Sequence, residues 1–272
     1  MLILYVFLEI LLFPFVLIYV LTGSNTRKSF LFRMGIYLPK QRETILFHTV
    51  SVGEFLAARN LIKKIMEENK DIFVSTVTLT GREMVLKEKL PHIFFPFDFP
   101  IIVERFLDSL NPKVVFIFET EIWPYFIFKC SKKKIPLIII NGRISDKSFK
   151  RYKKLSFFFK PFFEKIELVL AQSKEDAERF EVLGAKKVKV CGNLKFDIKI
   201  KEIPEEIRKI YDKFVEGREG WVAGSTLKGE EEIILKAHKE ILKENPGFFL
   251  ILAPRHPERA QEVEKIISDF DL

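Results

Sequence analysis

Short apolar runs rich in β-branched and aromatic residues alternate with amphipathic helical patterns over most of the chain. A continuous apolar run is typical of a strand buried on both faces of a parallel sheet, and helices such as 54–68 and 174–183 supply the crossovers that parallel strands require. The pattern predicts an α/β domain with an open, Rossmann-like sheet over residues 23–210. The predicted strands are Ile45 to His48, Ile72 to Val77, His92 to Phe95, Val114 to Phe118, Leu137 to Ile140, Leu168 to Ala171 and Val188 to Cys191.

The pattern restarts after a charged linker that contains Pro204. The elements predicted for residues 217–272 are strand Trp221 to Ala223, helix Glu230 to Lys243, strand Phe248 to Leu252 and helix Glu258 to Phe270. A domain of this type needs roughly five or six strands to cover its hydrophobic faces. The second domain is therefore expected to be truncated, in a fragment of a longer protein or in a shortened gene product.

Residues Met1 to Leu21 form an apolar run in which Glu9 is the one charged residue. At about 1.5 Å per residue a helix of this length covers the roughly 30 Å hydrocarbon core, which predicts a membrane anchor over residues 1–22. Lys and Arg follow the run and none precedes it, so the positive-inside rule places the rest of the chain on the cytoplasmic side of the inner membrane. A cleaved signal peptide is disfavoured, whereas a helix embedded in the inner leaflet is the alternative because Glu9 and Pro14 weaken a span.

The composition narrows the function only slightly. A formal charge of +8 suits nucleic acid, anionic lipid or a phosphorylated small substrate equally well. The two cysteines, Cys130 and Cys191, are not in a C-x-x-C pair, which argues against a disulfide framework or a zinc ribbon. Gly224 to Gly229 has P-loop glycine spacing, but Glu230 stands where the phosphate-binding Lys is required.

Polar residues follow several of the predicted strands, at the edge of a parallel sheet where ligands bind. The first strand leads into Ser51, Gly53 and Glu54, and Glu54 is either a carboxylate that interacts with the dipole of the next helix or a catalytic base. The fourth strand leads into Glu119 and Glu121. These two are either solvated loop acids or a partly buried pair in which one carboxylate has a raised pKa.

Four further strand ends carry groups suited to anions. Glycine turns after the fifth and seventh strands hold Arg143 and Lys195, which fit phosphate or carboxylate groups unless these segments are only turns. In the second domain, the hydroxyls of Ser225 and Thr226 precede a helix N-terminus, and Arg255 follows the next strand. Two strand ends that can bind anions, opposite another sheet domain, predict a cleft that binds a nucleotide sugar.

Eight segments, in this order and spacing, resemble the 3-deoxy-D-manno-oct-2-ulosonic acid (Kdo) transferase family of lipopolysaccharide synthesis. They are HTVSVGE (48–54), TLTG (78–81), PFDFP (96–100), ETEIWP (119–124), NGRIS (141–145), GNLKF (192–196), AGSTLKGEEE (223–232) and APRHPER (253–259). The resemblance implies a GT-B glycosyltransferase with two Rossmann-like domains, which transfers Kdo from CMP-Kdo to a lipid A precursor (lipid IVA), with no cofactor, metal or nucleic acid.

The resemblance also implies residue roles. It makes Glu54 the general base and Glu119 the second essential carboxylate. The implied donor contacts are Ser225, Thr226, Arg255 and His256, with Lys195 at the interdomain edge, and the acceptor-side residues are Ser51, Gly53 and Arg143. A carboxylate base suits a sugar hydroxyl, which is a poor nucleophile, and Arg with a helix N-terminus can stabilise the departing CMP phosphate.

Two departures from the family pattern leave other functions open. Leu227 stands where the family commonly has His, and the Leu-Glu-Pro segment that holds the nucleotide ribose in the family is absent from the sequence. The alternatives are another membrane-associated GT-B transferase that uses a UDP-sugar, and an inactive lipid-binding remnant.

Residues Lys147 to Lys165 combine seven cations with a cluster of phenylalanines. A core-packed helix with a solvated basic face is one interpretation. The other, which we favour on composition, is an interfacial segment that inserts Phe158, Phe159 and Phe162 at the acyl boundary and attracts anionic headgroups.

Overall fold

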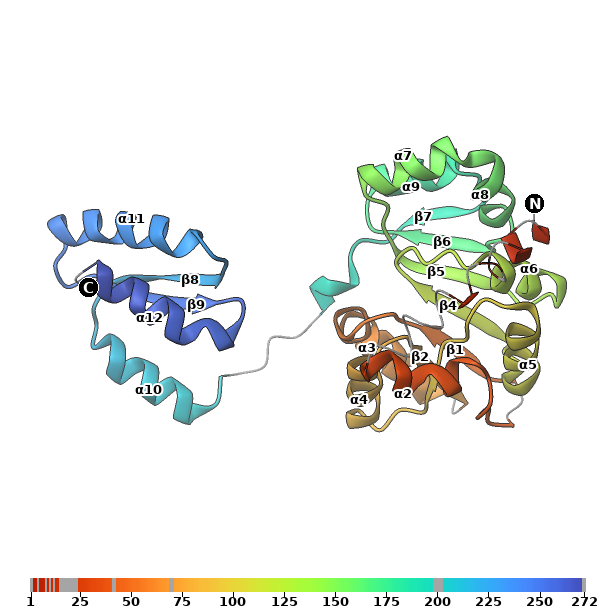
Figure 1. The fold of residues 1–272 in the computed structure, drawn as a ribbon, viewed down its shortest axis with the longest axis horizontal. Helices are drawn as coiled ribbons and strands as arrows, with labels where there is room; N and C mark the ends of the chain where they lie inside the picture. Colours follow the sequence, from red (N-terminus) through yellow and green to blue (C-terminus); the bar gives the residue numbers. More distant parts are fainter. Residues whose placement is uncertain are drawn as a thin grey trace. The chain divides into compact units, whose positions relative to one another are not determined.

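The computed structural model describes residues 2, 3, 5–7, 9, 11, 13, 14, 24–40, 43–68, 71–197 and 203–270. The chain divides into two compact units, residues 1–199 and residues 200–272 (Figure 1).

The first unit is built on a seven-stranded sheet in the order β3-β2-β1-β4-β5-β6-β7, and every neighbouring pair of strands is parallel. The order reverses beside β1, as in doubly wound α/β folds. The strands are β1 (Ile45–His48), β2 (Ile72–Thr76), β3 (His92–Phe94), β4 (Val114–Phe118), β5 (Leu137–Gly142), β6 (Leu168–Ala171) and β7 (Val188–Val190). All seven predicted strands are confirmed, and the α/β class with them.

Helices cover both faces of this sheet (Figure 1). Successive residues of a strand point to opposite faces. Accordingly, Ile117 belongs to one buried cluster together with Phe106 and Phe126, whereas its neighbour Phe118 belongs to another together with Phe55 and Ile62. The helices of the unit are α2 (Ser24–Arg33), α3 (Val52–Glu68), α4 (Leu79–Lys87), α5 (Pro100–Leu110), α6 (Pro124–Lys132), α7 (Asp146–Lys154), α8 (Ser156–Phe163), α9 (Lys174–Val182) and the 3-10 turn η1 (Leu194–Asp197).

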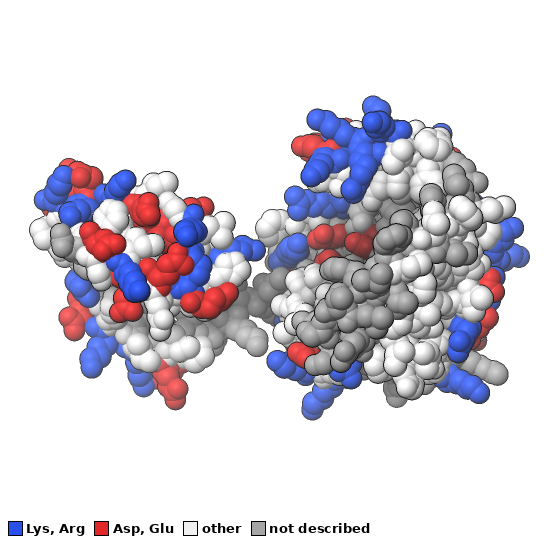
Figure 2. All heavy atoms as spheres, viewed as in Figure 1, with Lys and Arg blue, Asp and Glu red and all other residues white. Residues whose placement is uncertain are grey.

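The phenylalanine-rich segment forms α7 and α8, and most of its rings pack inward. Phe162 is 4% exposed, and the ring of Phe159 lies 4.7 Å from that of Tyr152. Phe158 and Phe159 are half-buried against the core, whereas Phe157 is 69% exposed. The expectation that Phe162 enters a membrane is therefore wrong, because the turn of α8 directs it into the hydrophobic core. The outer surface of α7 is strongly basic (Figure 2).

The second unit contains a pair of parallel strands, β8 (Gly220–Thr226) and β9 (Phe249–Pro254), among its described residues. Its helices are α10 (Glu205–Val215), α11 (Glu230–Glu244), the 3-10 turn η2 (Pro257–Arg259) and α12 (Ala260–Asp269). Helix α10 lies in the segment expected to be a linker, and it belongs to this unit because the ring of Phe214 packs 5.7 Å from that of Phe249. The domain boundary thus falls near residue 200 rather than residue 210.

The predicted membrane anchor, residues 1–22, lies in large part outside the described residues. Among the residues that are described, no helix has the length and apolar character needed to cross a bilayer. The side chains of Tyr5 and Val6 pack against the core of the first unit.

Candidate active site

A pocket of about 280 Å³ collects the polar residues that follow β4 and β5 and the first turn of α3, which follows β1. Parallel strands end at one edge of the sheet, so residues far apart in the sequence meet there. Figure 2 shows acidic side chains on the surface between α3 and α7. The residues that line the pocket are Glu54, Glu119, Thr120, Glu121, Arg143, Ile144, Ser145, Ser148 and Tyr152.

Glu54 both caps α3 and lines the pocket. Its Oε2 accepts a hydrogen bond of 2.7 Å from the Val50 backbone N–H, and its Oε1 lies 3.4 Å from the Ser51 hydroxyl. The Ser51 oxygen in turn accepts from the Glu54 backbone N–H at 3.4 Å, as in a capping box. Burial raises the pKa of Glu54, the Val50 hydrogen bond opposes this, and the nearby Glu119 raises it further. The two interpretations of Glu54, helix capping and proton acceptance, are thus compatible.

Glu119 adopts an unusual backbone conformation at the end of β4. Its φ of 59° lies in the left-handed region, which is strained for a residue with a side chain of this size. Its Oε1 pairs with Lys195 Nζ at 3.1 Å, across 76 residues of sequence. Two predicted site residues from the ends of β4 and β7 are therefore brought into contact.

Glu121 is a third carboxylate in the same pocket. Burial, followed by the charges of Glu54 and Glu119, raises its pKa to about 7. The prediction that one acid of the Glu119–Glu121 pair has a raised pKa is confirmed for Glu121. Its pKa therefore lies close to neutral pH, and in the protonated form this side chain can donate a hydrogen bond.

Asn141 is a positioning residue that spacing alone does not reveal. It is 2% exposed, has a φ of 55° at the end of β5, and its Oδ1 accepts a hydrogen bond of 2.9 Å from the Leu194 backbone N–H. That bond holds the turn that carries Lys195 to Glu119. The Gly-containing turn at 141–143 hints at this conformation, because Asn tolerates positive φ better than other residues.

The remaining predicted residues of the first unit have different surroundings. Arg143 lines the pocket with an exposed side chain, its carbonyl accepts from the Thr120 hydroxyl at 2.5 Å, and its guanidinium makes no ion pair with any described residue. The Ser51 side chain caps the start of α3, because its oxygen accepts a hydrogen bond from the Glu54 backbone N–H. Gly53 is exposed in the first turn of α3 and is absent from the residues that line the pocket.

In the second unit, the hydroxyl of Thr226 is directed inward. It donates to Glu231 Oε1 at 3.0 Å, and Arg259 Nη1 lies 2.9 Å from the same oxygen. Glu231 is fully buried, and although burial raises its pKa, the hydrogen bonds of Arg259 and Thr226 leave that pKa below its ordinary value. This bond uses the one proton of the Thr226 hydroxyl, so Thr226 can contact a donor sugar nucleotide through this group only as a hydrogen-bond acceptor.

The other predicted donor residues of this unit are exposed. Ser225 has a φ of 62° at the end of β8, so its short side chain stands at a strained strand end. The Arg255 side chain is exposed, and its backbone N–H donates to the Thr226 carbonyl at 3.0 Å. His256 Nδ1 lies 3.5 Å from Glu258 Oε1. Within the described ranges, no cluster of three or more His, Cys, Asp or Glu side chains is arranged to hold a metal ion.

The fold and the polar pocket define a class of protein, the GT-B-like α/β proteins. A UDP-GlcNAc 2-epimerase from Neisseria meningitidis, solved with UDP-GlcNAc, superposes with a TM-score of 0.59 and 16% identity over 84% of this chain and 69% of its own. A glycosyltransferase from Rickettsia africae gives a TM-score of 0.51 and 16% identity over 85% of this chain and 66% of its own. At these identities the likeness concerns the fold.

The sequence comparisons show the family. Residues 28–198 match the family model of 3-deoxy-D-manno-octulosonic-acid transferase (kdotransferase). A 3-deoxy-D-manno-octulosonic acid transferase of Haemophilus influenzae is 34% identical over 82% of this chain and 54% of its own length. That of Aquifex aeolicus is 36% identical over 82% of this chain and 58% of its own length. The chain therefore belongs to the Kdo transferase family, which confirms the resemblance inferred from the eight motifs.

The chain spans only part of its relatives. It matches about half the length of the Haemophilus and Aquifex proteins, and 37% of a bifunctional glycosyltransferase/methyltransferase of Fusobacterium nucleatum, with which it shares 38% identity.

Proposed function

We propose that this chain takes part in the transfer of Kdo from CMP-Kdo to a lipid A precursor, lipid IVA, by a single inverting displacement. The observation that carries the proposal is the partly buried Glu54 carboxylate, which faces a pocket shared with Glu119 and Arg143. A carboxylate whose pKa is raised is a better proton acceptor than a solvated one. The family membership supports the same reaction class.

In the proposed step, the acceptor hydroxyl gives its proton to Glu54 as its oxygen attacks the anomeric carbon of Kdo. The bond from that carbon to the CMP phosphate oxygen breaks, and CMP leaves with the electron pair. Glu119 and Lys195 form an ion pair beside the reacting groups, and we assign them the stabilisation of charge that develops there. We assign the donor to the exposed strand ends of the second unit, with Ser225, Arg255 and His256 as its contacts.

The lipid nature of the acceptor places the protein at the inner membrane in this proposal. Helix α7, two residues of which line the pocket, carries Lys147, Lys150, Arg151, Lys153 and Lys154 on exposed positions. Such a surface attracts anionic headgroups, with about 1 kcal/mol per cation near the membrane. Replacing Lys150, Lys153 and Lys154 by Ala should weaken binding to anionic vesicles, and binding of the unchanged protein should weaken with salt.

A transfer assay tests the proposed function directly. The protein is incubated with lipid IVA and either CMP-Kdo or a panel of UDP-sugars, and the product is followed by mass spectrometry. Product from CMP-Kdo alone supports the proposal, whereas product from a UDP-sugar identifies another transferase. Thermal unfolding with CMP provides an independent measurement, because a ligand that binds only the native state raises the melting temperature. An inactive protein that neither CMP nor CMP-Kdo stabilises is the result expected of a lipid-binding remnant.

A further inference from the structure

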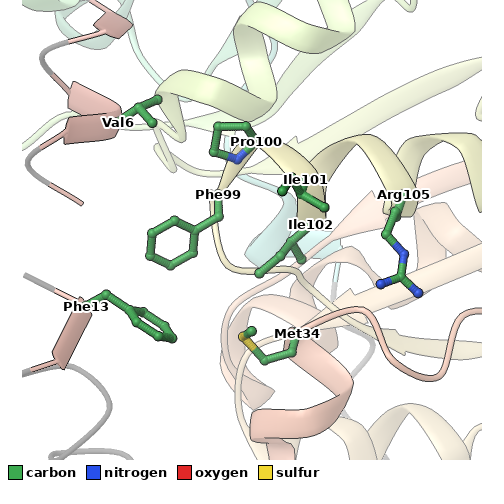
Figure 3. Close-up of a pocket in the computed structure, with 8 residues that line it drawn as sticks. All are labelled: Val6, Phe13, Met34, Phe99, Pro100, Ile101, Ile102 and Arg105. Carbon is green, nitrogen blue, oxygen red and sulfur yellow. The ribbon is translucent and has the colours of Figure 1, made fainter. Parts of the chain in front are cut away.

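A second cavity, of about 450 Å³, lies in the first unit and shares no lining residue with the active-site pocket. It is lined by Val6, Phe13, Met34, Phe99, Pro100, Ile101, Ile102 and Arg105 (Figure 3). Its volume is in the range of roughly 300–1,000 Å³ that is typical of small-molecule sites. Seven of its eight lining residues are apolar, so its interior favours a hydrocarbon chain over a sugar or a nucleotide.

Aromatic contact closes one side of this cavity. The ring of Phe13 meets that of Phe99 edge-on, with centroids 5.1 Å apart. Met34 and Ile102 lie on the other side, and Arg105 stands at the end away from Phe13 and Val6 (Figure 3). The cavity therefore has an apolar interior and a single cation at one end.

Arg105 also lines a neighbouring cavity of about 610 Å³ that is more polar. Lys40, Asp108, Ser109 and Asn111 contribute to that cavity. Asp108 is paired with Lys133 at 2.5 Å, whereas the guanidinium of Arg105 and the ammonium of Lys40 make no ion pair with any described residue. One cation without an ion pair, Arg105, thus belongs to both cavities, and a second, Lys40, lines the more polar one.

Large apolar side chains are exposed around the two cavities. Ile101 is 75% exposed, Tyr37 59% and Ile36 51%, and Ile101 and Ile36 line the first and the second cavity respectively. Exposed apolar groups that gather around a cavity mark contact with another apolar phase or molecule more often than groups scattered singly. A single-chain or multi-chain amphiphile would cover these groups with its hydrocarbon part.

From this juxtaposition we infer that the two cavities form a binding site for an anionic lipid. One acyl chain occupies the apolar cavity between Phe99, Ile101 and Met34, and the phosphate of the headgroup contacts Arg105 and Lys40. Charge complementarity selects an anionic over a neutral headgroup, because the guanidinium of Arg105 can bind two phosphate oxygens at once. The site lies outside the active-site pocket, with which it shares no lining residue.

The experiment is a calorimetric titration with dodecyl phosphate below its critical micelle concentration, with inorganic phosphate and dodecyl maltoside as comparison ligands. Dodecyl phosphate should bind saturably at one site and at least about tenfold more tightly than either comparison ligand. Arg105→Ala should weaken its binding about tenfold or more, because it removes a charge-assisted hydrogen bond. Ile101→Ser should weaken it severalfold, and because Ile101 is 75% exposed, this change leaves the fold intact.

Two control variants separate this site from other effects. Arg208→Ala removes an exposed Arg of α10 and should leave binding unchanged, and Glu54→Gln should leave it unchanged as well. Equal affinity in the Arg105 and Ile101 variants and the unchanged protein overturns the inference, as does titration without saturation. Tight binding of inorganic phosphate alone would assign the cations to a free anion and also overturn the lipid site. Loss of binding in Glu54→Gln would do the same, by moving the ligand to the active-site pocket.

Discussion

In the first unit, polar residues from the ends of β4 and β5 and from the start of α3 line one pocket, whereas in the second unit the last residue of β8 turns its hydroxyl inward to Glu231. Both arrangements arise at the carboxyl ends of parallel strands. The first sheet has seven strands, so several ends converge, and the second has two among its described residues. Position at a strand end thus brings a residue to the ligand edge, but its neighbours decide whether its polar atoms are free.

Both units contain residues with a strained backbone at the ends of strands. Glu119, Asn141 and Ser225 have φ values of 59°, 55° and 62° at the ends of β4, β5 and β8. A residue with a side chain in this conformation costs on the order of 1 kcal/mol or more, and such residues cluster at functional sites. Each unit therefore has strained backbone at a strand end, although the two units differ in the hydrogen-bond partners of the adjacent hydroxyls and carboxylates.

The largest effect should come from Glu54→Gln. Loss of the proton acceptor should lower the transfer rate about 100-fold or more. The glutamine oxygen can still accept the Val50 N–H bond, so the free energy of unfolding should change by no more than about 1 kcal/mol. Steady-state kinetics and thermal unfolding of the same sample measure both quantities.

Ser51→Ala is the matched control for that change. It removes the oxygen that accepts the Glu54 backbone N–H and should lower stability by about 1 kcal/mol, with a smaller loss of rate than Glu54→Gln. If Glu54→Gln retains near-normal turnover, or if Ser51→Ala loses as much activity, then Glu54 is only a capping residue.

The sequence predicts the first unit more completely than the second. All seven strands were predicted because each is a continuous apolar run between turns, and Glu119 and Lys195 were both predicted to lie at the ligand edge. The hydrogen bond from Leu194 to Asn141 was not predicted, since it joins residues 53 positions apart and depends on a left-handed backbone. Likewise, the burial of Glu231 with Arg259 could not be predicted from a sequence that places three glutamates together at a helix start.

The next largest effect should follow from changes at Asn141. Asn141→Gly keeps the positive φ without strain but removes the acceptor for Leu194 N–H, whereas Asn141→Ala removes the acceptor and adds strain. Both should lower the transfer rate about tenfold, because Lys195 is no longer held beside Glu119, and Asn141→Ala alone should also lose a further 1–2 kcal/mol of stability. A normal rate in Asn141→Gly would show that the strand end does not need this bond to position Lys195.

In the second unit, one substitution should lower the stability and another should weaken CMP binding. Thr226→Val leaves one hydrogen bond of the buried Glu231 unmade and should lower the stability of this unit by about 1–3 kcal/mol. Arg255→Ala changes an exposed side chain, so it should leave stability within about 0.5 kcal/mol but weaken CMP binding severalfold. Denaturant unfolding and calorimetric titration with CMP distinguish the two. Weaker CMP binding in Thr226→Val at full stability would show that the Thr226 hydroxyl reaches the nucleotide after all.

The smallest effect, and the most specific to the three-carboxylate pocket, concerns the pH dependence of Glu121. Its pKa is about 7 in the folded protein and about 4.5 in an unfolded chain. An acid whose pKa is raised by folding contributes most stability below pH 4.5, and this contribution is lost as the pH rises through 7. The melting temperature of the unchanged protein should therefore fall more between pH 5 and pH 8 than that of Glu121→Gln, which has no proton to lose.

Since Gln resembles the protonated acid, Glu121→Gln should also keep its transfer rate within severalfold of normal at pH 6. As the pH rises toward 8, this variant should lose less of its rate than the unchanged protein. Parallel melting curves for the two proteins across this range would mean that Glu121 is ionised throughout, and that the pocket accommodates three negative charges.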